Sequence, residues 1–284
     1  MMNEYFASAL LGLIQGLTEF LPVSSSGHLI LSSSLMGFDS TRIKIFEVAI
    51  QFGSILAVVL LYRQRFLRLL VPNFGSGTTD APHPFAGIRG LYLLFLTSLP
   101  ASLVGLILHD YIQRYLFNPL SVAAALATGA LFILFAEART TKRERVKADQ
   151  PGAIHEIHSL DSLTPSLALG IGCFQCLSLW PGFSRSTSTI MGGLLLGADR
   201  STAAEYSFIA AVPILAAASG FTLLKGMNHL TSADIPFFLI GTAMAFISAL
   251  AAIKIFIGFV SRFSFRPFAW YRLILAPLVF WFWS

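Results

Sequence analysis

The sequence predicts an all-α polytopic membrane protein in which six transmembrane helices and two re-entrant helix-loop-helix hairpins form a single domain. Hydrophobic residues make up 55% of the 284-residue chain and charged residues only 12%, whereas a soluble domain carries about 25% charged residues. Apolar stretches recur along the whole chain, and two of them are interrupted by short polar loops. A soluble fold would have too few charges to cover its surface, so the membrane must solvate most of the molecule.

Six apolar segments are long enough to cross a bilayer. A helical span needs roughly 20 consecutive, predominantly apolar residues. The six segments are 45–62, 91–109, 119–137, 203–224, 236–260 and 268–284. No Lys or Arg precedes Arg42, so the first apolar region lacks the basic start of a cleavable signal peptide and is expected to stay in the mature protein.

Two further apolar regions, 4–38 and 166–198, are broken near their centres. The first is interrupted by PVSSSGH at 22–28 and the second by PGFSRST at 181–187. Each half is too short to cross a membrane alone. Irregular backbone at membrane depth is tolerated only where it is buried in protein or lines a wet cavity. We therefore expect each region to form a re-entrant helix-loop-helix hairpin.

Basic residues in the connections indicate the orientation of the chain. The connections 63–90 and 139–163 are rich in Arg and Lys, and placing both in the cytoplasm satisfies the positive-inside rule. Both termini and the mouth of the first hairpin then lie on the external side, and the second hairpin opens toward the cytoplasm. The net charge of +5 therefore reflects orientation signals, and no nucleic-acid partner is expected because the basic residues are not interleaved with aromatic ones.

The two halves of the chain, approximately 1–140 and 160–284, resemble each other when one is shifted by about 160 residues along the other. The aligned pairs are Gln15 with Gln175, Pro22 with Pro181, Gly37 with Gly197, Asp39 with Asp199 and Glu47 with Glu205. Three spans, an odd number, separate the hairpins, so the second copy is inserted upside down. Inverted repeats whose broken helices meet near the bilayer midplane are also the plan of many transporters.

The first hairpin carries a carboxylate and a carboxamide. Gln15 and Glu19 are four residues apart, so both project from one face of a helix. Their oxygen atoms suit a hard divalent cation such as Mg²⁺ or Ca²⁺. An ionisable group inside a membrane segment is costly and is therefore a functional candidate. The alternative is that Glu19 lies at the membrane interface and is simply hydrated.

The loop that follows contains Ser24, Ser25, Ser26, Gly27 and His28. Its backbone N–H groups and the N-terminus of the next helix can bind an anion. The serines alone could equally cap that helix. An imidazole within reach of a hydroxyl can take its proton or protonate a leaving oxygen, so a chemical role for this loop is favoured.

The second loop places a cation where we expect the membrane. Arg185 keeps its charge there, and its guanidinium matches the oxygens of a phosphate with two parallel hydrogen bonds. A purely structural ion pair between Arg185 and Glu19 is the alternative. Neighbouring hydroxyls can donate further hydrogen bonds to a phosphate. These belong to Ser184, Ser186, Thr187, Ser188 and Thr189.

Together these motifs resemble those of the undecaprenyl-diphosphate phosphatases, also called bacitracin-resistance proteins. The first family motif, Glu or Gln followed four residues later by Glu, is matched by Gln15 and Glu19 and runs into FLPVSSSGH at 20–28. The second, PGxSRS with a threonine shortly after, is matched at 181–186 and by Thr189. Thr187 stands where the family favours glycine. The resemblance covers essentially the whole chain.

The resemblance implies hydrolysis of undecaprenyl diphosphate to undecaprenyl phosphate, the lipid carrier for cell-wall sugars, in the bacterial inner membrane. It implies a nucleophile at Ser25 or His28, phosphate binding at Arg185 and a divalent metal near Glu19. Three routes stay open, in which Ser25 attacks with His28 as base, His28 itself attacks, or a water attacks. The groups expected around the phosphate are Ser24, Ser26, Gly27, Ser184, Ser186 and Thr189.

The lipid tail is expected to remain in the bilayer while the diphosphate enters a polar cavity that faces the periplasm. Two other functions remain to be weighed. A lipid-carrier flippase or other transporter shares the inverted-repeat plan but needs no nucleophile. Another lipid-phosphatase superfamily with an SGH sequence needs a histidine six residues after the arginine of its SR motif, where this chain has Met191. The oligomeric state, a homodimer included, is left open.

Overall fold

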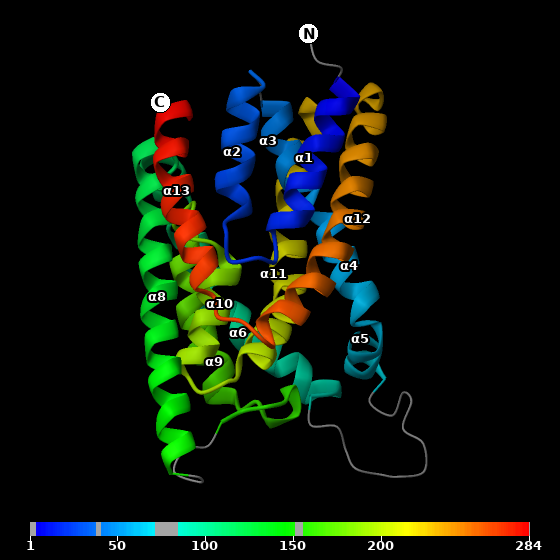
Figure 1. The fold of residues 1–284 in the computed structure, drawn as a ribbon. Helices are drawn as coiled ribbons and strands as arrows, with labels where there is room; N and C mark the ends of the chain where they lie inside the picture. Colours follow the sequence, from blue (N-terminus) through cyan, green and yellow to red (C-terminus); the bar gives the residue numbers. More distant parts are fainter. Residues whose placement is uncertain (1–3, 38–40, 72–84, 151–155, 284) are drawn as a thin grey trace.

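The computed structural model describes residues 4–37, 41–71, 85–150 and 156–283 (Figure 1). Within these ranges the secondary structure is helical, and the one pairing of extended backbone is an isolated bridge between Ile157 and Ala198. The predicted all-α class is confirmed.

Five helical stretches of the described residues are long and apolar enough to cross a membrane. They are Arg42–Leu61, Gly87–Ile107, Pro119–Val146, Arg200–His229 and Ser232–Val260, and each overlaps one predicted span. The sixth predicted span, 268–284, lies mostly in α13, Arg266–Trp283, which is not among the five. The molecule is thus a helical membrane protein with five candidate spans.

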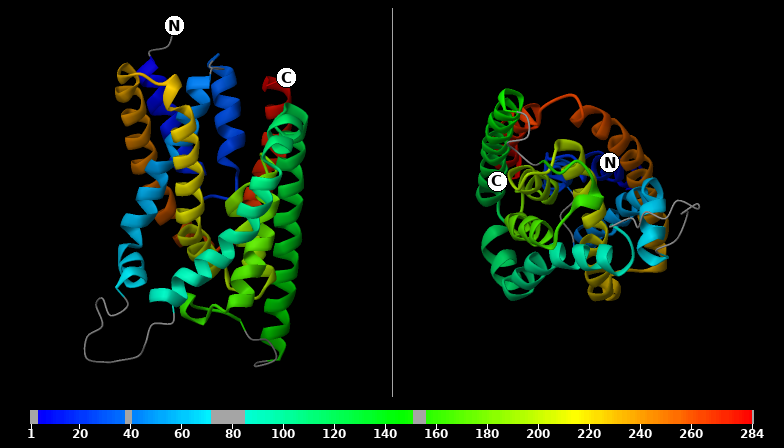
Figure 2. Two further views of the ribbon diagram at one scale, coloured as in Figure 1. Left: turned by 180° about the vertical axis from the view of Figure 1, so that it is seen from behind. Right: turned by 90° about the horizontal axis from the view of Figure 1, so that it is seen from below.

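The long helices run roughly along the length of the molecule (Figure 1), with the helix Gly87–Ile107 inclined to the others (Figure 2). In chain order they are α3 (Thr41–Ala49) with α4 (Gln51–Leu61), α6 (Gly87–Ile107), α8 (Pro119–Asp149), α11 (Arg200–Gly226), α12 (Ile235–Val260) and α13 (Arg266–Trp283). The short α5 (Arg63–Leu70) follows α4. The start of α1 and the end of α13 lie at the same end of the molecule, which both side views make clear (Figure 1, Figure 2).

Both interrupted regions fold as two helices joined by a short loop. The first pair is α1 (Glu4–Thr18) and α2 (Ser25–Leu35), and the second is α9 (Pro165–Gln175) and α10 (Arg185–Leu195) with the short turn η3 (Cys176–Leu179) between them. The first pair occupies the upper half of the molecule in Figure 1 and the second pair the lower half. Their loops meet, because the Ser186 hydroxyl donates to the Leu21 carbonyl at 2.8 Å.

The same backbone device starts the second helix of each pair. Ser24 and Ser184 are the N-caps of α2 and α10, and both have positive φ, 72° and 79°. Each serine oxygen accepts a hydrogen bond from the backbone N–H three residues on, at Gly27 and Thr187. Since a capping side chain satisfies a helix N–H that would otherwise lack a partner, the serines fix where each helix begins.

Small residues hold α1 close to α12. A Cβ added at Gly12 would lie 2.2 Å from the Gly241 carbonyl oxygen, and one at Gly16 would lie 2.1 Å from Ser248 Oγ. Close backbone approach through small residues is the usual way in which membrane helices associate. The packing fixes the face of α1 that carries Gln15.

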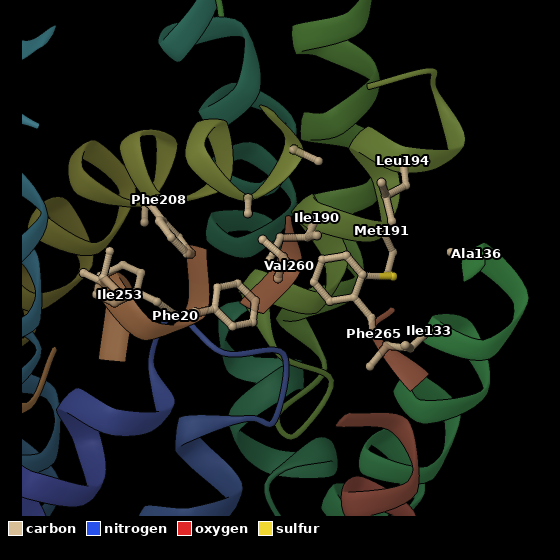
Figure 3. Close-up of a cluster of buried hydrophobic side chains, with 14 of the residues drawn as sticks. Phe20, Ile133, Ala136, Ile190, Met191, Leu194, Phe208, Ile253, Val260 and Phe265 are labelled. Carbon is tan, nitrogen blue, oxygen red and sulfur yellow. The ribbon is translucent and has the colours of Figure 1, made fainter. Parts of the chain in front are cut away.

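A buried apolar cluster lies beside the tip of the first hairpin (Figure 3). Phe20, directly after Glu19, is fully buried and meets Phe208 edge to face at a centroid distance of 5.2 Å. Met191 and Phe265 belong to the same cluster. Apolar packing therefore anchors the residue next to Glu19.

Candidate active site

Glu19 is the centre of a hydrogen-bonded row at the junction of the two hairpins. Its side chain is 5% exposed, and Oε1 lies 3.2 Å from Arg185 Nη2. Its other oxygen, Oε2, accepts from Ser25 Oγ at 2.8 Å and from Gln15 Nε2 at 2.8 Å. The structure thus brings together four of the residues singled out in the sequence.

Arg185 is held by a partner that the sequence did not reveal. Its Nη1 donates to the Ser207 carbonyl at 3.0 Å and to Ser207 Oγ at 3.2 Å, and Ser207 Oγ also shares a 2.6 Å hydrogen bond with Thr189. Arg185 Nε is buried without a hydrogen-bond partner among the described residues. A buried donor left unpaired is costly, so the Nε edge of the guanidinium is prepared for an acceptor such as a phosphate oxygen.

His28 is hydrogen-bonded on both sides of its ring. Nδ1 lies 2.7 Å from the Ser24 carbonyl, which can only accept, so Nδ1 carries a proton. In the neutral ring Nε2 is then the acceptor, and the Tyr271 hydroxyl donates to it at 2.6 Å. The two rings are nearly parallel, with centroids 5.5 Å apart. These hydrogen bonds direct the imidazole toward α13 and not toward the Ser25 hydroxyl.

The hydroxyls predicted to surround the phosphate are mostly engaged within the protein. Ser184 Oγ accepts from the Thr187 N–H and lies 3.0 Å from Ser186 Oγ. Thr189 Oγ1 donates to the Arg185 carbonyl at 2.9 Å. In the first loop Ser24 is the N-cap and Gly27 is its N–H donor, while Ser26 is exposed.

Sequence reasoning missed Arg272, a fully buried arginine of α13. Its guanidinium donates to the Gly182 carbonyl at 3.0 Å, to Thr187 Oγ1 at 2.7 Å and to the Pro22 carbonyl at 3.5 Å. It also reaches the carbonyls of Ala125 and Leu126 in α8. One cation therefore ties both loops to α8. Its charge inside the apolar segment 268–284 could have marked it as a candidate from the sequence.

Arg272 also gives the threonine at position 187 a structural role. A glycine there would have no hydroxyl, whereas Thr187 gives the guanidinium an additional acceptor. Gly129 makes room for the same group, since a Cβ there would lie 2.1 Å from Arg272 Nη2.

The oxygen atoms of Glu19 and Gln15 can supply part of the ligand shell of a hard cation. No three His, Cys, Asp or Glu side chains gather as a possible metal site within the described ranges. Gln15 Oε1 is buried and lacks a hydrogen-bond partner among the described residues, so one neutral oxygen ligand is available next to the carboxylate. Magnesium commonly binds to one or two carboxylates and completes its shell with substrate phosphates and water. The donor set fits that kind of site.

The fold and the site define a helical membrane protein in which a buried acid meets a partly buried arginine and serine at the junction of two hairpin loops. The chain belongs to the bacitracin resistance protein BacA family, whose model matches residues 8–278. The family resemblance inferred from the motifs is thereby confirmed.

Relatives match along the whole chain and share one name. The undecaprenyl-diphosphatase of Maridesulfovibrio salexigens is 56% identical over 283 residues and covers 100% of both chains. That of Nitratidesulfovibrio vulgaris is 56% identical over 282 residues, 99% of each chain. That of Lawsonia intracellularis is 48% identical over 280 residues, 99% of this chain and 98% of the relative. Membership of this family places the chain outside the other lipid-phosphatase superfamily that has an SGH sequence. Met191, which stands where that superfamily needs a histidine, is a buried residue of the apolar cluster (Figure 3).

Proposed function

We propose that this protein is a membrane phosphatase that hydrolyses undecaprenyl diphosphate to undecaprenyl phosphate and inorganic phosphate. The observation that carries the proposal is the row formed by Ser25, Glu19 and Arg185, with hydrogen bonds of 2.8 Å and 3.2 Å. It joins a nucleophile, a base and a phosphate-binding cation. The relatives' phosphatase name supports the same activity over a transporter. Recycling of this carrier supplies cell-wall synthesis and confers bacitracin resistance.

In the proposed reaction Ser25 is the nucleophile and Glu19 is its base. Ser25 Oγ attacks the terminal phosphorus, the bond from that phosphorus to the bridging oxygen breaks, and undecaprenyl phosphate leaves. The serine proton passes to Glu19 Oε2, the atom that already accepts its hydrogen bond. Glu19 gives this proton to the departing undecaprenyl phosphate and is a carboxylate again. Water then attacks the phosphoserine, Glu19 takes a proton from the water and returns it to Ser25 Oγ as the phosphorus–oxygen bond breaks, and inorganic phosphate is released. His28 takes no proton in this route because both ring nitrogens have other partners.

Arg185 stabilises the charge on the transferred phosphoryl group. Phosphoryl transfer depends mainly on positioning and on neutralising charge on the equatorial oxygens. Without substrate, the guanidinium neutralises Glu19. With substrate, its unpaired Nε and the neighbouring Nη2 form a fork for two phosphate oxygens. Ser207 holds Nη1 and so keeps that fork directed at the loop junction.

A divalent cation, Mg²⁺ or Ca²⁺, is proposed to bind to Glu19 and Gln15 together with the diphosphate. When bound, the cation supplies further neutralisation of phosphate charge. The unpaired Gln15 Oε1 supports this assignment. Removal of divalent ions with a chelator should lower phosphate release, and added Mg²⁺ or Ca²⁺ should restore it. Unchanged turnover in chelator would contradict the assignment.

The two hairpins are proposed to be re-entrant halves of an inverted repeat between six crossings in the inner membrane. The matching caps Ser24 and Ser184 support the repeat, and the five candidate spans support the crossings. The termini and the site are assigned to the periplasmic side. Reporter fusions at both ends test this orientation, and a cytoplasmic signal from either end would contradict it.

The function is tested by phosphate release from undecaprenyl diphosphate by purified protein in detergent. Wild type should release phosphate, and Arg185→Ala should not. Protein that binds the lipid without releasing phosphate would refute the phosphatase and favour transport. Flipping of the lipid in vesicles by Ser25→Ala would reveal an additional transport activity.

A further inference from the structure

An open groove of about 570 Å³ lies between the first hairpin, α12 and α13. Leu17 and Val23 line it from the hairpin, Ala252 and Phe256 from α12, and Phe268 from α13. Its volume falls within the range of about 300–1,000 Å³ that is usual for small-molecule sites. The row of Ser25, Glu19 and Arg185 does not use this groove.

The wall of the groove offers little to a polar ligand. Thr18 Oγ1 donates to the Ile14 carbonyl at 2.7 Å. His28 and Tyr271 also line the groove and are hydrogen-bonded to each other at 2.6 Å. The polar atoms of these side chains are thus engaged within the protein. The remaining wall is aliphatic and aromatic, which suits a hydrocarbon.

The groove is continuous with the candidate active site through the backbone of the first loop. Thr18 directly precedes Glu19, and Val23 directly precedes the N-cap Ser24. His28 belongs to both regions, because it lines the groove and its Nδ1 bonds to the Ser24 carbonyl. A ligand whose phosphorus lies beside Ser25 therefore has this apolar surface next to the remainder of its structure.

Resting on the proposed function, we propose that this groove binds the isoprene units nearest the diphosphate of the substrate. Membrane lipid is as apolar as the wall, so the groove gains little affinity from hydrophobic burial. Its effect is to orient the lipid, so that the terminal phosphorus reaches Ser25 and the leaving prenyl phosphate stays on the groove side. The groove thereby selects diphosphates that carry a prenyl tail.

The test compares kcat/KM for undecaprenyl diphosphate with that for methyl diphosphate, which has no isoprene unit. Ala252→Phe fills the groove, so the ratio of the two values should fall about tenfold, in keeping with the loss expected when a reacting group is misplaced. Ala251→Phe makes the same change one residue earlier, at an exposed position outside the groove lining, and should keep the wild-type ratio. An unchanged ratio in folded Ala252→Phe would overturn the proposal.

A second measurement does not depend on any substitution. Ala252 is only 6% exposed, so the larger side chain can impair folding. Wild-type protein is therefore photolabelled with a polyprenyl diphosphate that carries a diazirine on its first isoprene unit. Labelled peptides should come from 17–23, 252–259 and 267–271. Labels in the separate cavity around Ser33, Lys44 and Trp283, or spread over lipid-facing helices, would refute the groove.

The two proposals fail in different ways. Wild type that releases no phosphate from either diphosphate refutes the phosphatase. If wild type hydrolyses both diphosphates, Ala252→Phe keeps the wild-type ratio and the labels fall outside the groove, the phosphatase activity stands. Those results refute the tail site alone.

Discussion

The two hairpin loops share one backbone design but carry different chemistry. Ser24 and Ser184 adopt the same unusual conformation and make the same cap. After its cap, the first loop presents Ser25 to Glu19, whereas the second presents Arg185 to the same carboxylate. Two loops with the same capped backbone thus bring a hydroxyl from one side of Glu19 and a cation from the other. Substitutions in the two loops distinguish the role of this shared backbone from the role of the reactive side chains.

The largest expected effect is loss of the cation. Arg185→Ala should lower kcat/KM by about 10³-fold or more, the magnitude found when a phosphoryl-transfer arginine is absent. Arg185→Lys keeps the charge but loses the fork, so it should recover only part of the activity. The exposed Arg145→Ala is the matched control and should behave as wild type. Substantial turnover in Arg185→Ala would remove the second loop from the chemistry.

Loss of the nucleophile should be almost as severe. Ser25→Ala removes the hydroxyl that donates to Glu19 and should lower kcat by about 10³-fold, since a positioned nucleophile and base act as one unit. Acid-quenched wild type, turning over substrate labelled on its terminal phosphate, should carry the label on Ser25. Unlabelled protein together with active Ser25→Ala would favour direct attack by water.

Arg272, which bonds to both loops, should contribute to the free energy of unfolding. Arg272→Ala removes donors to Gly182, Thr187 and Pro22, and should lower the free energy of unfolding by about 3 kcal/mol or more, since each hydrogen bond to a charged group is worth about 1.5–3 kcal/mol. Thr187→Val removes a single acceptor and should cost less. Thermal unfolding in detergent measures both. A Tm unchanged in Arg272→Ala would show that the loops are held by other contacts.

The caps should give smaller and matched effects if the frames are equivalent. Ser24→Ala and Ser184→Ala should each destabilise the protein by about 1 kcal/mol. Glycine at either position should cost less than alanine, because positive φ strains a residue that has a Cβ. Clearly unequal losses in unfolding experiments would show that only one loop depends on its cap.

The smallest expected effect lies at Asp199, the N-cap of α11. Burial alone would raise its pKa, but hydrogen bonds from the Thr202 N–H and from His158 outweigh burial and hold the pKa below its usual value. The ionised Asp199 carboxylate therefore stabilises the folded protein fully above the unfolded-state pKa of about 3.9. This stabilisation is lost as pH falls through the lower folded-state pKa. Asp199→Asn should narrow the Tm difference between pH 6 and pH 3. Its aligned partner Asp39 lies outside the described residues.

The broken hairpins could be predicted because Pro, Gly and Ser interrupt apolar runs at definite positions. The meeting of the two loop tips could be predicted from the inverted repeat, whereas a direct ion pair between Glu19 and Arg185 was only the alternative interpretation. Both side chains were visible as charges in apolar surroundings. The Tyr271 partner of His28 lies 243 residues away, so no local pattern could reveal it. The sequence also could not tell whether a loop hydroxyl is free to bind substrate or, like that of Ser186, donates to a backbone carbonyl of the protein.

The contact of α1 with α12 limits how the molecule can move. Carriers that alternate access rock one helical bundle against another. Here Gly16 and Ser248 leave no space even for a methyl group, so α1 cannot rotate about its axis against α12 without separating from it. A swing of the first hairpin that keeps this contact must carry α12 with it.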